Sequence, residues 1–431
     1  MLYKSLNYLS KSESFKEAVI KGIAQDNGLY YPEKIKPFSK KLIRNLNKLS
    51  LHNIAFKAIK QFIGNAIPEK KLKTIIEETL NFDFPLIQIE ENIFSLELFH
   101  GPTLAFKDVG ARFMARCLEY FNKNSNEKIT VLVATSGDTG GAVADGFYNV
   151  SGVEVIILYP KGKVSVIQEK QMTTLGKNII PLEVEGVFDD CQDMVKRAFL
   201  DMQINEKRKL TSANSINIAR WLPQMFYYFA GYIKASKFNL PINFSVPSGN
   251  FGNLYAGLIT QKLGLPINHF LACTNLNNVV PRYLDSGIYM PNDTIKTISN
   301  AMDVGNPSNF IRVQKVFNND IAKLKKNISG YSFNDNETKK CIKNVYNKSN
   351  YILDPHGAIG YLGLKEYSIT NPNQIGIFME TAHPCKFSNV VEKCINQKLD
   401  IPKKLIKTLK GDKYSLKISD YRQLKDYLLK D

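Results

Sequence analysis

The sequence of 431 residues has few cysteines, and they are scattered along the chain. No two of them form a Cys-x-x-Cys pair, and the six are Cys117, Cys191, Cys273, Cys341, Cys385 and Cys394. This spacing argues against a zinc site and against a disulfide framework. We therefore expect no bound metal, and free thiols in a reducing cytoplasm.

Long apolar segments are also missing. No window approaches the roughly 18 apolar residues of a membrane span, and the polar stretch Met1–Lys16 lacks the apolar core of a signal peptide. Apolar residues make up 44% and charged residues 23% of the chain, as in ordinary globular proteins. The sequence thus predicts a cytoplasmic protein that does not associate with a membrane.

Acidic side chains are outnumbered by basic ones, 40 against 57, which gives a net charge of +17. Nucleic-acid binding is one explanation of such a balance. The lysines, however, are dispersed singly or in pairs such as Lys40-Lys41, without a stripe or an arginine-rich arm. Because this pattern is more typical of a solvated surface, we expect no nucleic-acid partner. Basic nucleic-acid binding remains the alternative from a different functional class.

The chain is long enough for two or three domains, and it has no repeats or long linkers that would separate them. The first 90 or so residues favour short helices, for example Ser14–Ile23 and Glu69–Leu80. From residue 93, apolar strands alternate with helices, which predicts an α/β fold with mostly parallel sheets. The expected strands are Ile93–Leu98, Ile129–Ala134, Val153–Leu158, Ile242–Val246 and Ile375–Met379.

Segments rich in Gly, Ser, Thr and Asn follow several of these strands. In a parallel sheet, ligands bind beyond the carboxyl ends of the strands, so these segments are expected around one crevice. Ser248–Asn253 lies between a strand and a helix, where main-chain N–H groups can surround a phosphate, although such a turn alone is more often only a turn. Thr211–Arg220 suits either an anion site or a helix cap with a surface arginine.

The segment from Phe99 to Asp108 contains a lysine, Lys107, among apolar residues at the start of a predicted helix. It is not a nucleotide-binding P-loop, since no glycine directly precedes the lysine and no Ser or Thr follows it. Partial burial and the positive end of the helix both lower the pKa of a lysine and favour its nucleophilic amine. A lysine that forms a Schiff base needs this setting.

Several motifs together resemble those of the threonine synthases, a family of pyridoxal-phosphate (PLP) enzymes of the tryptophan-synthase-β-like fold, fold type II. The first is His100-Gly101-Pro102-Thr103-x-x-Phe106-Lys107-Asp108. The others, in the same order as in the family, are Asp26-x-Gly28-Leu29-Tyr30-x-Pro32, Thr135–Gly140, Asn214–Asn217, Gly249–Asn253, Asn300–Asn309 and Thr381–Pro384. One departure is Asn27, where the family usually has glycine. Asparagine also tolerates positive φ.

The resemblance implies both fold and chemistry. It implies a mainly helical N-terminal region (1–92) packed on a large PLP-binding α/β domain (93–110 and 222–400), a small α/β domain (111–221) and a C-terminal tail (401–431). Lys107 would carry PLP as a Schiff base. The reaction would convert O-phospho-L-homoserine and water to L-threonine and phosphate, the last step of threonine biosynthesis, in a monomer or a homodimer.

The resemblance also implies the site residues. Besides Lys107, the cofactor would be bound by Gly249, Asn250, Phe251, Gly252 and Asn253 at its phosphate and by Thr381 at its pyridine nitrogen. The substrate would be bound by Ser136, Gly137, Asp138 and Thr139 at its α-carboxylate and by Asn214, Ser215 and Arg220 at its phosphate. Many relatives have Asn in place of Asp138, where it contacts the 3′-oxygen of the cofactor. An aspartate donates no hydrogen bond unless it is protonated, so its role stays open.

Two rival functions share this chemistry, namely a serine or threonine dehydratase and a phospholyase-like relative without synthase activity. A dehydratase has no use for a phosphate site around Arg220, which discriminates against it. The hydroxyl of Thr381 cannot hold the pyridine nitrogen protonated as a carboxylate would, which suits elimination and replacement more than transamination. Lys107 would serve in turn as base and acid.

Overall fold

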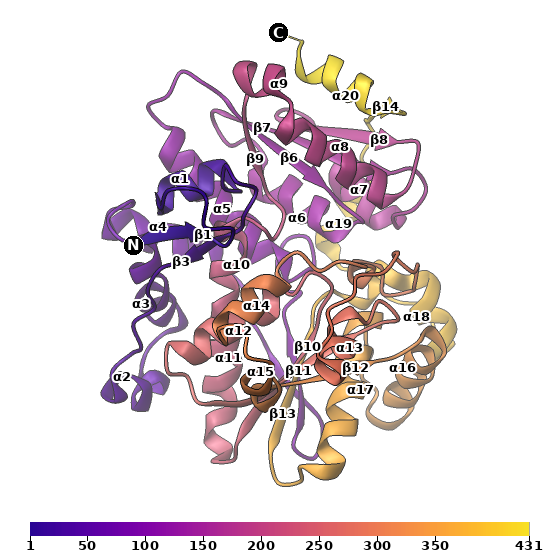
Figure 1. Cartoon of the computed structure of the whole chain (residues 1–431). Coiled ribbons are helices and arrows are strands. Elements are labelled where there is room, and N and C mark those ends of the chain that lie inside the picture. The colour runs from indigo at the N-terminus through magenta and orange to yellow at the C-terminus, as the bar shows by residue number, and fades with distance from the viewer. Residues whose placement is uncertain (431) are drawn as a thin grey trace.

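Two open sheets form the centre of the molecule in the computed structural model, which describes residues 1–430. Figure 1 shows the smaller sheet above the larger one. The larger sheet has the order β12-β11-β10-β13-β5-β4, and only β4 is antiparallel to its neighbour. Its strands are β4 (Leu86–Glu90), β5 (Ile93–Glu97), β10 (Ile242–Pro247), β11 (Ile267–Thr274), β12 (Ile328–Ser332) and β13 (Ile375–Glu380).

The smaller sheet has the order β14-β8-β7-β6-β9, and all its strands are parallel. These strands are β6 (Ile129–Ala134), β7 (Val153–Pro160), β8 (Ile179–Val184), β9 (Lys209–Ser212) and β14 (Leu416–Ile418). Each of the five strands expected from the sequence is present in one of the two sheets, and none of their ends differs by more than two residues.

Both faces of each sheet are buried. Successive side chains of a strand point to opposite faces, so a strand of consecutive apolar residues gives both faces apolar side chains. In β11, Phe270 and Ala272 pack into one hydrophobic cluster, whereas Leu271 and Cys273 pack into another. The strand therefore has no polar face to offer to water. Helices on both sides of a mostly parallel sheet are the arrangement that such strands require, and the predicted fold class is confirmed.

Helices cover these faces in four groups. On the larger sheet, one face is covered by α16 (Asp335–Ser349), α17 (Pro355–Thr370) and α18 (Ser388–Ile395), and the other by α11 (Met225–Ala235), α12 (Gly252–Lys262), α13 (Val279–Ser286), α14 (Phe310–Val316) and α15 (Ile321–Asn327). On the smaller sheet, the corresponding groups are α5 (Lys107–Asn122), α6 (Asp138–Phe147) and α7 (Val166–Thr173), and α8 (Phe188–Leu200) with α9 (Met202–Lys207). The short α10 (Ile218–Trp221) packs on α5.

The N-terminal region packs against helices of both layers (Figure 1). It consists of a small antiparallel sheet, β1 (Leu2–Ser5), β2 (Glu13–Ser14) and β3 (Tyr30–Pro32), and of α1 (Phe15–Lys21), α2 (Lys40–Arg44), α3 (Leu51–Ile63) and α4 (Glu69–Thr79). Asn27, which stands where the family usually has glycine, has a φ of 61°, so the chain here does adopt the left-handed conformation. Asparagine accommodates it at little energetic cost.

The residues expected as a C-terminal tail add to the smaller sheet. β14 pairs with β8, and α20 (Tyr421–Leu428) buries Leu424 and Leu428 in the cluster beneath α8. Nearer the cleft, α19 (Lys403–Lys410) packs on α7. All six cysteines are free thiols. Within residues 1–430, no helix combines the length and the apolar character that crossing a membrane requires.

Candidate active site

A cleft of about 870 Å³, its opening to solvent included, lies at the carboxyl ends of strands from both sheets. Of the site residues predicted from the sequence, only Gly137 does not line this cleft. Gly137 belongs to the loop between β6 and α6 and has a φ of 141°. A Cβ on this residue would come within 2.4 Å of the Gln168 side chain. The predicted residues that line the cleft are Lys107, Ser136, Asp138, Thr139, Asn214, Ser215, Arg220, Gly249, Asn250, Phe251, Gly252, Asn253 and Thr381.

Lys107 is the first residue of α5, and its side chain lines the cleft. The preceding residues are tied to the end of β13, since the main-chain N–H of Phe106 donates to the Thr381 carbonyl oxygen at 2.8 Å. The Lys107 side chain is only 17% exposed, and burial lowers its pKa below the usual lysine value. The nearby charges of Lys386 and Arg220 lower it further, while Asp138 opposes them. The site therefore favours the neutral, nucleophilic amine.

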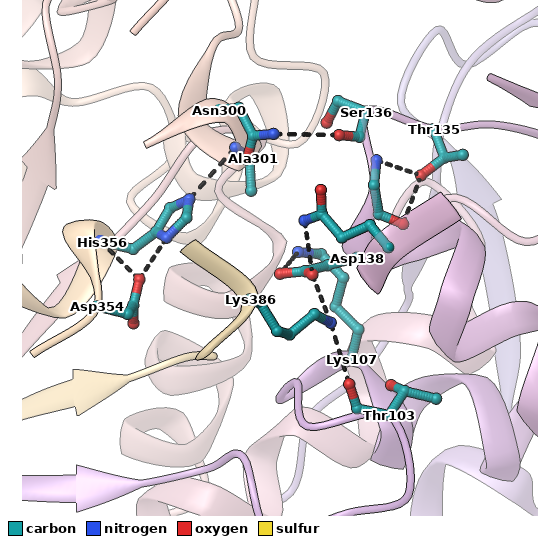
Figure 2. A network of polar contacts seen from close by, with 12 residues as sticks. Thr103, Lys107, Thr135, Ser136, Asp138, Asn300, Ala301, Asp354, His356 and Lys386 are labelled. Atoms are coloured by element: carbon teal, nitrogen blue, oxygen red, sulfur yellow. Dashed lines mark hydrogen bonds and ion pairs between the residues drawn. The ribbon is translucent and has the colours of Figure 1, made fainter. Parts of the chain in front are cut away.

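Asp138 is the nearest carboxylate to Lys107, with 4.0 Å between Lys107 Nζ and Asp138 Oδ2. Its other oxygen, Oδ1, is 2.6 Å from Lys386 Nζ and accepts a hydrogen bond from Gln168 Nε2 at 2.9 Å. Burial alone would raise the pKa of this carboxyl, but Lys386 and Lys107 overcome that effect and hold it well below its usual range. Asp138 is thus an ionised carboxylate, and Figure 2 shows both lysines directed at it.

The loop between β6 and α6 is shaped by one hydroxyl. Thr135 Oγ1 accepts hydrogen bonds from the main-chain N–H groups of Gly137 at 3.0 Å and of Gly140 at 2.8 Å. Across the cleft, Asn300 Nδ2 donates to the Ser136 carbonyl oxygen at 3.3 Å, as Figure 2 shows. This contact joins the smaller sheet's loop to the 3₁₀ helix η4 (Asn300–Met302), which belongs to the larger sheet's layer.

The glycine-rich loop after β10 is packed so closely that only main chain fits. A Cβ on Gly249 would lie 2.7 Å from the Ala301 carbonyl oxygen and 2.9 Å from Met302 Cα. Phe251 adopts the left-handed conformation, with φ 61°, and directly precedes the first residue of α12. A main-chain cradle at the positive end of an eleven-residue helix suits the phosphate group of PLP, so these residues fit the cofactor.

Arg220 brings a buried positive charge to the same cleft. It is 3% exposed, its Nη1 donates to the Ala213 carbonyl oxygen, and its Nε has no hydrogen-bond partner. Burial lowers its pKa to about 10, which still leaves the guanidinium charged at neutral pH. No carboxylate of residues 1–430 lies within ion-pair distance of it. A buried guanidinium without a counter-ion is a ready site for an anion.

The other predicted residues around the cleft are held by hydrogen bonds within the chain. Asn214 Nδ2 donates to the Ala134 carbonyl oxygen at 3.0 Å, and Ser215 Oγ accepts from Asn309 Nδ2 at 3.0 Å. Thr381, 6% exposed, follows directly after the buried Glu380. The Glu380 carboxyl accepts the main-chain N–H of Asp354 at 2.5 Å.

Sequence reasoning missed His356, which lines the cleft, and Lys386, which contacts the lining residue Asp138. The main-chain N–H of Ala301 donates to His356 Nε2 at 3.3 Å, so the ring proton resides on Nδ1, 2.5 Å from Asp354 Oδ1. The Asp-Pro pair before His356 is a pattern typical of helix starts, and it would have placed this histidine in the first turn of a helix. Lys386 lies two residues after the Thr381–Pro384 motif, and nothing in the sequence separates it from a surface lysine.

Comparisons with known proteins agree with this geometry. The family model described as "Pyridoxal-phosphate dependent enzyme" matches residues 82–375, and "Threonine synthase N terminus" matches residues 2–80. A threonine synthase of Buchnera aphidicola subsp. Baizongia pistaciae is 45% identical, with 96% of each chain covered.

Two solved structures are similar over nearly their whole length. The crystal structure of threonine synthase from Escherichia coli has a TM-score of 0.94 and 39% identity, with 100% of this chain and 99% of that chain covered. PLP-bound threonine synthase from Brucella melitensis has a TM-score of 0.92 and 32% identity, with 99% and 98% covered. The chain belongs to the threonine synthase family of PLP-dependent enzymes.

Proposed function

We propose that this chain converts O-phospho-L-homoserine and water to L-threonine and inorganic phosphate with PLP as cofactor. The observation that carries the proposal is the presence, in one cleft, of a lysine whose pKa is lowered by burial and of a buried guanidinium without a counter-ion. The first provides the amine that PLP chemistry needs. The second provides a place for a substrate phosphate, which a dehydratase would not use.

Lys107 is proposed to hold the cofactor, with Gly249, Asn250, Phe251, Gly252 and Asn253 around its phosphate and Thr381 beside its pyridine nitrogen. When bound, PLP supplies an electron sink that stabilises negative charge on the substrate's α-carbon. Three observations support the fit: the main-chain cradle at the start of α12, the tie between Phe106 and Thr381, and the buried position of the Thr381 side chain.

The proton transfers are assigned to Nζ of Lys107. As a free base, this nitrogen would accept the proton from the α-carbon of the substrate, pass it into the conjugated system of substrate and cofactor, and as a free base again accept a proton from the β-carbon. Phosphate would then leave from the γ-carbon, which takes a proton back from Nζ and becomes the methyl group. Water would add its hydroxyl at the β-carbon while its other proton goes to the departing phosphate, and the α-carbon would regain its proton. One amine can serve as base and acid in turn because its pKa is lowered from that of an exposed lysine.

The remaining residues are proposed to orient the substrate. Ser136 and Thr139 would offer main-chain N–H and hydroxyl donors to its α-carboxylate. Gly137, which was also expected to bind this group, lies outside the cleft lining and donates its N–H to Thr135 Oγ1, so it supports the shape of the loop instead. Lys386 neutralises Asp138, so this carboxylate does not repel the negatively charged substrate.

The phosphate is assigned to Arg220, Asn214 and Ser215. The guanidinium of Arg220 offers charge and its unpaired Nε–H, and the neighbouring amide and hydroxyl complete a set of donors suited to a dianion. A bound phosphate would thus replace the missing counter-ion of a charge that is costly to bury alone.

The experiment is turnover of O-phospho-L-homoserine by the purified protein loaded with PLP, with threonine and phosphate measured separately. Equal amounts of both products are expected from the wild type and from Lys393→Ala, a control at an exposed lysine of α18. Lys107→Ala should lose nearly all turnover. Release of phosphate without threonine from the wild type would instead indicate a phospholyase-like enzyme or a phosphatase.

We also propose that the chain works in the cytoplasm as a monomer or a homodimer, without a nucleic-acid partner. The six free thiols, five of which are buried, and the dispersed lysines support this proposal. The two sheets support a large domain of residues 93–110 and 222–400 and a small one of 111–221. Light scattering after size-exclusion chromatography tests the oligomeric state, and any binding to DNA or RNA should fall steeply with added salt.

A further inference from the structure

A second buried amine, that of Lys386, lies next to the cleft in contact with its lining residue Asp138. Lys386 lies on the 3₁₀ helix η5 (Pro384–Phe387), far from Lys107 in the sequence, and its side chain is completely buried. Its Nζ is 2.6 Å from Asp138 Oδ1 and donates to the Thr103 carbonyl oxygen at 3.0 Å. Figure 2 shows Lys386 between these two acceptors, with Lys107 reaching the same carboxylate.

The two lysines share one carboxylate unequally. Lys386 makes a charge-assisted hydrogen bond to Asp138, whereas Lys107 Nζ stays 4.0 Å from the other oxygen, beyond hydrogen-bonding distance, and lies 4.9 Å from the centre of the Phe106 ring. A buried ammonium needs both a counter-ion and hydrogen-bond acceptors. Lys386 has both within 3.0 Å, whereas Lys107 has only the longer ion pair of 4.0 Å with Asp138. One carboxylate therefore neutralises one ammonium, and the ammonium that it neutralises is that of Lys386.

We propose that Lys386 is a positioning residue that binds the Asp138 carboxylate in competition with Lys107 and thereby leaves the Lys107 amine as the free base. Lys386 acts through Asp138 and does not touch the substrate. The consequence for catalysis rests on the proposed function, in which Lys107 carries the cofactor and moves the protons.

Other charged and titratable groups surround the two amines but do not replace this pair. Besides Asp138 and Lys386, the charges of Arg220 and Asp354 also shift the pKa of Lys107. Asp354 is hydrogen-bonded to His356. The charge of Lys386 also lowers the pKa values of Asp108, His383 and Cys385. The remaining close partner of the Asp138 carboxylate is the neutral amide of Gln168. A change at Lys386 therefore alters chiefly the share of Asp138 that is available to Lys107.

Two variants should move the ionisation of Lys107 in opposite directions. In Lys386→Met, an uncharged side chain of similar length, Asp138 becomes free to pair with Lys107, so that the amine holds its proton to higher pH. In Asp138→Asn the carboxylate is lost while the Lys386 charge remains, so that Lys107 loses its proton at lower pH. A merely structural role for either residue predicts no such opposition.

The test is competitive acetylation of the full-length protein after removal of PLP with hydroxylamine. Labelling of the peptide that contains Lys107 is quantified by mass spectrometry from pH 6 to 11, with an exposed lysine, Lys393, as internal standard. In Lys386→Met, labelling of Lys107 near neutral pH should fall about tenfold or more, since an opposite charge at this distance shifts a pKa by about one to three units. In Asp138→Asn the midpoint should move to lower pH.

Lys386→Arg provides the matched control, because it keeps the charge and should keep the midpoint close to that of the wild type. An unchanged or lowered midpoint in Lys386→Met would overturn the proposal, as would a raised one in Asp138→Asn. Should Lys386→Met fail to fold by circular dichroism, the other two variants still decide. The labelling needs no turnover. An inactive wild type would therefore refute the proposed function and leave this inference standing. Unchanged midpoints in an active enzyme would refute this inference and leave the proposed function standing.

Discussion

Replacing Arg220 by Gln should abolish efficient use of the phosphorylated substrate without releasing the cofactor. Arg220 is 3% exposed and has no carboxylate partner among the described residues, and its only hydrogen bond from Nη1 goes to the Ala213 carbonyl oxygen. The charge therefore contributes little to holding this chain together and is available to a ligand. The loop proposed to bind the phosphate of PLP, Gly249–Asn253, is a separate element at the start of α12.

The expected effect follows from the loss of a charged partner in a buried site. Truncating one member of a buried, hydrogen-bonded charge pair costs about 2–5 kcal/mol. At about 1.4 kcal/mol per factor of ten, this corresponds to a loss of roughly 30- to 4000-fold in kcat/KM. Because the glutamine also relieves the burial of an unpaired charge, the stability of the free protein should change little or rise.

The assay compares steady-state kinetics and the visible absorption spectrum of Arg220→Gln with those of Arg44→Gln, a change at an exposed arginine of α2. Both variants should retain the PLP band, and only Arg220→Gln should lose kcat/KM. Loss of the PLP band in Arg220→Gln would show that Arg220 holds the cofactor's phosphate. A kcat/KM within threefold of the wild type would refute the assignment of Arg220 to any anion in the reaction.

Three further predictions address the cofactor site and the N-terminal loop. Gly249→Ala should weaken PLP retention about fivefold or more in equilibrium dialysis, because the added methyl group would press on the Ala301 carbonyl at 2.7 Å; unchanged retention would contradict the cradle. Thr381→Asp should slow threonine formation and increase transamination, both measured by product analysis, whereas unchanged rates would remove Thr381 from the site. Burial raises the pKa of the half-buried Asp26, but hydrogen bonds from Ser5 and from main-chain N–H groups together outweigh this effect and lower the value to about 2. Its contribution to stability, about 1 kcal/mol after allowance for solvent exposure, is therefore present above pH 4 and lost between pH 4 and 2, so thermal denaturation of Asp26→Asn and wild type should differ at pH 6 and converge at pH 2.

The fold was accessible from the sequence because its strands are short apolar runs that end in turn-forming residues. Ile129–Ala134 is predicted and observed with the same bounds. The helix expected from about Asp108 begins at Lys107, one residue earlier, since the tie of Phe106 to Thr381 fixes where the helix can start. The residues 401–430 gave no comparable pattern, because β14 has only three residues and depends on β8 for its hydrogen bonds. The domain boundaries stay a prediction.

The site was accessible only in part. Motifs near strand ends identified the lining of the cleft, because the topology of a parallel sheet brings those ends together. Gly137 belongs to the same loop as the lining residues, but a side chain at this position would point at Gln168 and not into the cleft. The spacing of residues in the sequence does not indicate this direction. Lys386 could not be singled out, because its role depends on the tertiary contact with Asp138, 248 positions away in the chain.

Turnover of O-phospho-L-homoserine in water enriched in ¹⁸O tests the central claim most directly. If phosphate leaves by cleavage of the bond between the γ-carbon and oxygen and water then adds at the β-carbon, the hydroxyl of threonine must carry ¹⁸O and the released phosphate must carry none. Mass spectrometry of both products from one reaction gives the answer. Unlabelled threonine, or phosphate that carries ¹⁸O, would contradict the account, because the first excludes solvent water as the source of the hydroxyl and the second indicates hydrolysis at phosphorus.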